Sequence, residues 1–153
     1  AEFGGSAYLR LLFDTEQGLP PAVDLAQEVR LAGLLRRLAA DPLIHTIHDL
    51  SEGGLAMALT EATFDSGLGC RVAWDVESSR FFSESQARAV LACSPSAVEA
   101  VLGAAAQAGV PAQEIGEVGG ERLEIRGAGD AATLVVADLR RRWSDALPRA
   151  LAL

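Results

Sequence analysis

The twenty residues from Leu43 to Ala62, LIHTIHDLSEGGLAMALTEA, constrain the fold more than any other stretch. They begin as an apolar run with β-branched residues, pass through Gly53 and Gly54, and continue as a strong helix former. A strand that turns directly into a helix leaves the first helical N–H groups unpaired, and the helix dipole favours an anion beside them. Paired glycines also let a ligand approach the main chain. The stretch therefore predicts a strand, a glycine turn and a helix that form an anion-binding site.

A purely structural role accounts for the same residues equally well. Gly-Gly turns are common, and Ser51 or Asp49 would then simply cap the helix. The turn is not a P-loop, because that motif requires a lysine and all 13 basic residues of this chain are arginine. The glycine spacing of the dinucleotide-binding fingerprint is also missing. Both interpretations of the turn stay open at this point.

Composition bounds the class of protein. The 153 residues suffice for one domain with a real core, and we expect residues 1–153 to form a single domain. The net charge of −8 argues against sequence-independent binding of nucleic acid. The sequence contains no run of 18 apolar residues, so we expect no membrane span, and no signal peptide is recognisable. Cys70 and Cys93 form no CxxC motif, so we expect two free thiols and a cytoplasmic location. Because the chain begins with Ala1, we expect a fragment of a larger protein, with residues 1–3 a candidate cloning remnant.

Hydrophobic periodicity predicts alternating strands and helices. The predicted strands cover residues 7–13, 43–47, 70–76, 88–94, 113–118, 122–126 and 133–137. The predicted helices cover residues 24–40, 55–65, 95–107 and 138–147. Gly119-Gly120-Glu121 favours a hairpin between the two strands that flank it, and Pro148 is expected to end or kink the last helix. This order of elements predicts an α/β (α+β) sandwich, a mixed sheet with helices packed on one face.

A second polar cluster lies between residues 83 and 88. Arg88 offers a two-pronged donor for phosphate or carboxylate, and Ser83 and Ser85 add neutral donors. An internal pair between Arg88 and Glu84 that merely stabilises the loop is an equally good interpretation. His45 and His48 stand three apart on one strand, so they point to opposite faces and do not form a metal site together. The residues predict no metal ligands, and no catalytic residue.

Four segments carry a resemblance to a known family. Residues 48–55, HDLSEGGL, resemble the H-D-x-S-x-G-G-L segment in C-terminal domains of the aminoimidazole ribonucleotide (AIR) synthetase superfamily. Three others resemble segments of its phosphoribosylformylglycinamidine synthase family: residues 4–9 (GGSAYL), 82–88 (FSESQAR) and 115–118 (IGEV). They occur in the order and spacing of that family and cover nearly the whole chain. One departure is Ala7, which stands where the family commonly has Glu.

The resemblance implies the fold of an AIR synthetase-related C-terminal domain and a role in purine biosynthesis. The family enzyme uses ATP and glutamine-derived ammonia to convert formylglycinamide ribonucleotide to formylglycinamidine ribonucleotide. It implies ATP and Mg²⁺ bound mainly outside this chain, and an isolated chain that is inactive. The implied partners are the remaining domains of the synthase, a glutaminase subunit, a small accessory subunit and the small-molecule substrate. The residues it implies for a phosphorylated ligand are His48, Asp49, Ser51, Gly53 and Gly54, followed in rank by Ser83, Ser85 and Arg88.

Two other functions stay open on the sequence. One is a stand-alone module that binds a phosphate or nucleotide without a reaction. The other is a domain of a different superfamily member, such as a kinase or a selenophosphate-type synthetase. The segment Phe82–Arg88 favours the synthase. The sequence does not indicate whether the cleft is catalytic or is the structural equivalent of a catalytic cleft.

Overall fold

The computed structural model describes residues 2–151, which divide into two compact units. Unit 1 comprises Ala1–Ala58 and Ser79–Glu114, and unit 2 comprises Leu59–Ser78 and Ile115–Leu153. Each unit is therefore assembled from two stretches of chain that are separated in sequence. Neither unit corresponds to a continuous half of the polypeptide.

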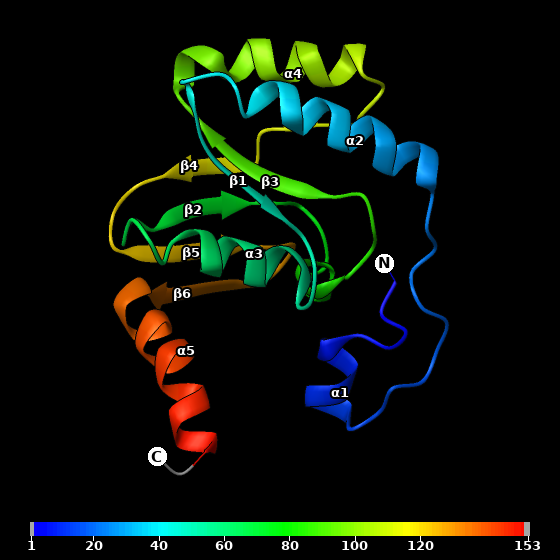
Figure 1. The fold of residues 1–153 in the computed structure, drawn as a ribbon. Coiled ribbons are helices and arrows are strands. Elements are labelled where there is room, and N and C mark those ends of the chain that lie inside the picture. Colours follow the sequence, from blue (N-terminus) through cyan, green and yellow to red (C-terminus); the bar gives the residue numbers. More distant parts are fainter. Residues whose placement is uncertain (1, 152–153) are drawn as a thin grey trace. The chain divides into compact units, whose positions relative to one another are not determined.

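Unit 1 is built on a two-stranded antiparallel ribbon (Figure 1). Strand β1, Ile44–Asp49, pairs with β3, Ala89–Cys93, so that His48 lies opposite Val90 and Asp49 opposite Ala89. The other elements that lie in this unit are α1 (Ala7–Phe13), α2 (Leu25–Leu38), most of the 3-10 turn η1 (Ser78–Phe82), η2 (Pro95–Ala97) and α4 (Val98–Gln107). Helix α3, Gly54–Ala62, follows β1 and begins in this unit.

Helices α2 and α4 enclose the core of unit 1. The buried side chains from these helices and the segment after them are Leu34, Leu38, Val101, Ala105 and Val110. Apolar residues of the ribbon, among them Ile47 and Leu91, pack against this cluster. The helices therefore cover one face of the ribbon (Figure 1), and the predicted helices over 24–40 and 95–107 are confirmed to within a few residues.

Residues 7–13 were expected to form a strand, and that prediction is wrong, because they form helix α1. Ser6 caps it: its Oγ accepts a hydrogen bond from Leu9 N at 3.3 Å, and the residue is 1% exposed. Leucine, alanine and arginine are good helix formers, and a seven-residue apolar run does not distinguish the two periodicities. Tyr8 stacks on the ring of Phe82 at a centroid distance of 5.3 Å, which ties this helix to the last residue of η1.

Unit 2 contains a four-stranded mixed sheet followed by a helix. The elements are β2 (Cys70–Ala73), β4 (Gly116–Val118), β5 (Arg122–Arg126), β6 (Ala131–Val135) and α5 (Val136–Ala150). The strand order is β4-β2-β5-β6, with β2 antiparallel to β4 and parallel to β5. Pro148 lies inside the last turn of α5, so of the two effects expected of it, ending the helix is wrong.

The expected hairpin between β4 and β5 is also wrong, since the two strands lie on opposite sides of β2. Gly69 N donates to Gly120 O, and Gly119 N donates to Gly69 O, both at 2.8 Å. The Gly-Gly turn thus pairs with the start of β2 rather than closing on itself. A Cβ on Gly69 would lie 1.9 Å from Arg122 O, so only glycine fits in this crossing.

The predicted fold class, mixed α/β, is confirmed. Within residues 2–151, however, the strands are divided between two sheets instead of forming a single one. The predicted strand over 70–76 is shorter than expected and ends at Ala73. Of the helices in this described range, none is long and apolar enough to cross a membrane.

Candidate functional site

The glycine turn connects β1 to α3 in unit 1. Gly53 and Gly54 have φ angles of +74° and +60°, a left-handed conformation that favours glycine. A Cβ on Gly54 would lie 2.4 Å from Ser83 O and 2.8 Å from Phe81 O. The backbone of residues 81–83 therefore rests directly on Gly54. This close packing within the chain, by itself, requires glycine at that position.

The structure brings the two predicted polar clusters together. Leu50 N donates to Arg88 O at 3.1 Å, which extends the β1–β3 ladder beyond its last paired residues. The turn that follows β1 and the loop that precedes β3 are consequently neighbours at one end of the ribbon. Segments that lie about 35 positions apart in sequence, residues 48–54 and 82–88, form one polar region. We call it the turn–loop region.

Glu84 is the central residue of the turn–loop region. Its Oε1 accepts a hydrogen bond from Gly53 N at 2.9 Å and a second from Ala7 N, also at 2.9 Å. Ala7 is the first residue of α1, so one carboxylate oxygen joins a helix N-terminus to the glycine turn. A carboxylate is the anion that such amide groups favour. The position where an external anion was expected to contact Gly53 N is thus filled by the protein itself.

The sequence did not indicate this role of Glu84. It suggested only an internal pair between Glu84 and Arg88, and within residues 2–151 the donors of Arg88 bind Ser85 O and Ser83 O instead. The cap expected from Asp49 or Ser51 does not reach Gly53 N either, because Glu84 is its acceptor. The sequence signal for this role was the acid in residues 82–85, FSES, but the two backbone N–H groups that it binds lie 31 and 77 positions away. Sequence spacing alone does not identify such partners.

Arg88 turns its guanidinium toward its own loop. Nε donates to Ser85 O at 2.9 Å, and Nη2 donates to Ser83 O. Burial lowers the pKa of Arg88, while the charge of Glu2 acts in the opposite direction. Since the donors of Arg88 close the loop, its contribution in this structure is to hold the backbone of residues 83–88 in place.

The two serines complete this internal network. Ser83 is 3% exposed, and its Oγ lies 3.0 Å from Ser85 Oγ and accepts from Glu2 N at 3.4 Å. Ala87 has a φ of +54°, unusual for a residue with a side chain, and its N–H donates to Glu28 Oε1 at 2.9 Å. Glutamates from α2 and from the loop itself thus fix both the turn and the loop.

The outer rim of the turn carries the side chains that face solvent. Asp49 and Ser51 are exposed, and the Asp49 side chain is 79% accessible. His48 lies partly buried, with Nδ1 2.8 Å from Asp49 O. Ser51 O accepts from Gly54 N at 3.0 Å, which closes the turn. These three residues present an imidazole, a carboxylate and a hydroxyl, groups that bind hydroxyls and N–H groups of a ligand.

Charge limits what this rim binds. Asp49 and Glu52 are both exposed acids, and two carboxylates disfavour an unaccompanied phosphate. Among the residues that the structure describes, no group of three or more His, Cys, Asp or Glu side chains is placed to hold a metal ion. The described residues therefore do not by themselves form a complete Mg²⁺ site.

Comparison with known proteins gives a consistent result. The family model described as "AIR synthase related protein, C-terminal domain" matches residues 1–127. This chain belongs to that family. The match runs through residues of both compact units and includes every residue of the turn–loop region.

Relatives of this AIR synthase-related domain are longer proteins. The phosphoribosylformylglycinamidine synthase subunit PurL of Methylocella silvestris is 42% identical over 148 residues, which are 95% of this chain and 20% of that protein. The chain thus spans about a fifth of the length of the curated relatives that it matches.

Solved structures show the same fold. T. maritima PurL complexed with FGAR has a TM-score of 0.71 at 23% identity, covering 79% of this chain and 22% of that one. The structure of PurLQS from Thermotoga maritima has a TM-score of 0.69 at 21% identity, covering 90% of this chain and 25% of that one. T. maritima PurL complexed with ATP, 24% identical with a TM-score of 0.68, covers 77% of this chain and 22% of that one.

Proposed function

We propose that this chain is the C-terminal domain of a phosphoribosylformylglycinamidine synthase, an ATP-dependent C–N ligase of purine biosynthesis. The full enzyme would join glutamine-derived ammonia to formylglycinamide ribonucleotide. One observation carries the proposal: three segments that define the family resemblance converge on Glu84, which bonds Ala7 and Gly53. Relatives at about 40% identity are subunits of this synthase, and this supports the same assignment.

Within that enzyme the turn–loop region forms one wall of a cleft for a phosphorylated ligand. His48, Asp49 and Ser51 supply the groups that contact it, and the glycines let the turn take its shape. Ser83, Ser85 and Arg88 contribute by fixing the loop on which the turn rests. ATP, and any Mg²⁺ that accompanies it, would be held mainly by the rest of the enzyme, so the isolated chain is inactive.

Exposed apolar side chains support a larger assembly. Leu11, Leu19 and Leu25 are 77%, 87% and 74% exposed. Large apolar side chains concentrated in 15 residues are typical of a surface that another part of a protein covers. We propose that the remaining domains of the synthase cover them, that residues 1–153 act as one domain, and that the assembly is a cytoplasmic amidotransferase complex with glutaminase and small accessory subunits.

The test uses the full-length enzyme from the same source, assayed with ATP, formylglycinamide ribonucleotide and ammonia. We expect the double variant Asp49→Asn/Ser51→Ala to lower kcat/KM by about 10- to 100-fold, because ligand-positioning contacts are lost. Gln113→Ala, an exposed site outside the region, is the control. Glycine substitutions are unsuitable, since Gly54 packs on backbone.

The outcomes separate two failures. If wild-type enzyme shows no such turnover, the proposed reaction is wrong. If wild type is active and the double variant equals it, the reaction stands and the assignment of the rim residues is wrong. Loss of turnover with unchanged thermal unfolding supports both.

A further inference from the structure

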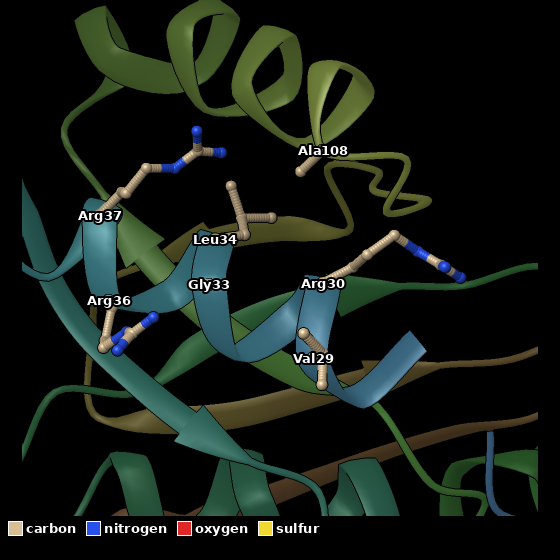
Figure 2. A pocket seen from close by; sticks show the side chains of 7 residues that line it. All are labelled: Val29, Arg30, Gly33, Leu34, Arg36, Arg37 and Ala108. Carbon is tan, nitrogen blue, oxygen red and sulfur yellow. The ribbon is translucent and has the colours of Figure 1, made fainter. Parts of the chain in front are cut away.

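A groove in unit 1 lies away from the turn–loop region. It runs between α2 and the end of α4, has a volume of about 550 Å³, and is shown in Figure 2. The residues that line it are Val29, Arg30, Gly33, Leu34, Arg36, Arg37 and Ala108. Its floor is apolar and its ends are cationic. We call it the α2–α4 groove.

Arg30 and Arg37 lie seven positions apart, so they share one face of α2 and are separated by about 10 Å along the helix axis. Figure 2 shows their side chains extending over the two ends of the groove, with Leu34 and Gly33 between them. Both arginines are exposed. The groove therefore presents two positive charges flanking an apolar centre.

No acidic residue of the described chain forms an ion pair with these arginines. Among residues 2–151, no ion pair and no side-chain hydrogen bond involves Arg30, Arg36 or Arg37. The chain has 21 acidic residues against 13 basic ones, so acids are plentiful. Elsewhere they are used: Arg71 pairs with Glu117 and Glu124. Glu28, the acid on α2 itself, is engaged by Ala87 N.

Gly33 gives a second, independent indication. It lies in the interior of α2, where glycine costs about 1 kcal/mol relative to alanine. A Cβ at this position would meet nothing within 4 Å, and its φ is not in the left-handed range. Nothing inside the described chain therefore requires glycine here, in contrast to Gly54. A glycine at the centre of the groove leaves room for another main chain to approach α2 closely.

A second hollow, of about 310 Å³, adjoins the groove at the end of α4. Its lining is apolar and is formed by Leu102, Ala106, Gly109, Val110, Pro111 and Ala112. Gly109 also lies beside Arg30, because a Cβ there would be 3.7 Å from Arg30 Cδ. The surface available to a partner thus continues from the two arginines onto apolar side chains.

We propose that the α2–α4 groove docks an acidic helical segment of another polypeptide. Two carboxylates two turns apart on that segment would face Arg30 and Arg37, with a small apolar side chain between them on Leu34 and Gly33. The opposite charges match in sign and spacing. The elongated spacing favours such a segment over a single small anion, for which both arginines would have to bend toward Leu34. The proposal does not depend on the synthase reaction.

The test places the photo-crosslinking residue p-benzoylphenylalanine at position 36 of the full-length protein in its source cell, with position 140 on α5 as the control site. Residue 36 is exposed and lines the groove, and Gly33 keeps the space that the proposal requires. Crosslinked peptides are identified by mass spectrometry. We expect a position-36 crosslink to one acidic, amphipathic segment of a different polypeptide. Its yield should fall about tenfold or more in Arg30→Glu/Arg37→Glu, and stay within twofold in the charge-matched control Arg140→Glu/Arg142→Glu.

Four results would overturn the proposal: a crosslink only within the same polypeptide, a crosslink to a second copy through a segment without acids, no polypeptide crosslink at all, or a yield unaffected by the reversal of Arg30 and Arg37. The absence of any polypeptide would point to a small anion as the ligand. Synthase turnover is measured in parallel, and its retention in both double variants keeps failure of the groove distinct from failure of the proposed reaction.

Discussion

The turn–loop region and the α2–α4 groove both combine glycine with charged side chains, yet they use these residues in opposite ways. In the turn–loop region, Gly54 is required by backbone atoms of residues 81–83, and Glu84 and Arg88 spend their hydrogen bonds on nearby backbone groups. In the groove, a Cβ on Gly33 would meet nothing within 4 Å, and the arginines form no ion pair within the described chain. The polar groups of the turn–loop region are satisfied within the chain, whereas those of the α2–α4 groove are available to the acidic partner that we propose.

This difference bears on how motif residues are interpreted. The turn–loop residues are those that the family resemblance indicates for ligand binding, but most of their polar atoms hold the local structure together. Under the proposed function, these residues contribute to ligand binding only indirectly, because they position the exposed rim at Asp49 and Ser51. Polar groups without a partner inside the described chain, and glycines that no contact inside it requires, indicate instead surfaces that are available to other molecules.

The largest expected effect comes from exchanging the two glycines for alanine, one at a time. Gly54→Ala should destabilise the chain by about 3 kcal/mol or more, since a left-handed φ and contact with Ser83 O both oppose a Cβ. Gly33→Ala should stabilise it by about 0.5 to 1 kcal/mol, through helix propensity. Urea unfolding of both variants measures the contrast. Equal effects of the two substitutions would remove the distinction between the regions.

Glu84 gives the next effect in size. Glu84→Ala leaves Ala7 N and Gly53 N without their acceptor and should cost about 2 to 4 kcal/mol in unfolding free energy. Glu84→Gln keeps an oxygen acceptor without the charge and should cost about half as much. Glu52→Ala, an exposed acid on the same turn, is the control and should stay within about 0.5 kcal/mol. A Glu84→Ala variant as stable as this control would show that the carboxylate does not hold α1 to the turn.

The smallest effect concerns Cys70 in unit 2, which is 7% exposed. Burial raises its pKa above the ordinary value of 9.0. Above about pH 9 the unfolded chain therefore loses the thiol proton before the folded chain does, and stability falls as pH rises, by at most about 1.4 kcal/mol per pH unit. Cys70→Ala should flatten this alkaline decline, measured as unfolding free energy between pH 7 and 10. An unchanged slope in the variant would assign the decline to other groups.

Local pattern was sufficient to predict the elements whose periodicity is long or sharply punctuated. Helices α2 and α4 and the sequence from β1 through the glycine turn to α3 follow directly from apolar spacing, Asp24, and the glycine pair. The failures were nonlocal. Residues 7–13 are too few to separate strand from helix, and the Gly119-Gly120 turn was mistaken for a hairpin because its partner, Gly69, lies far back in the sequence.

The same limit applies to the candidate site. The sequence indicated both polar clusters, and the antiparallel pairing of β1 with β3 brings them together. It could not reveal that Glu84 accepts the hydrogen bond of Gly53 N–H or that Arg88 donates to the backbone of its own loop. Both depend on three-dimensional proximity. The ligand role of His48, Asp49 and Ser51 stays a prediction that mutagenesis must test.

The bond between Ala7 and Glu84 also has a consequence for biosynthesis of the chain. Helix α1 has seven residues, too few for a stable isolated helix in water. Its stabilising carboxylate is synthesised 77 residues later, a delay of about 4 to 15 seconds at ordinary translation rates. During that interval the exposed leucines of α1 have no native partner from the segment around Glu84. Residues 7–13 are therefore a part of this domain on which a chaperone, or a domain already folded, would act before Glu84 has been synthesised.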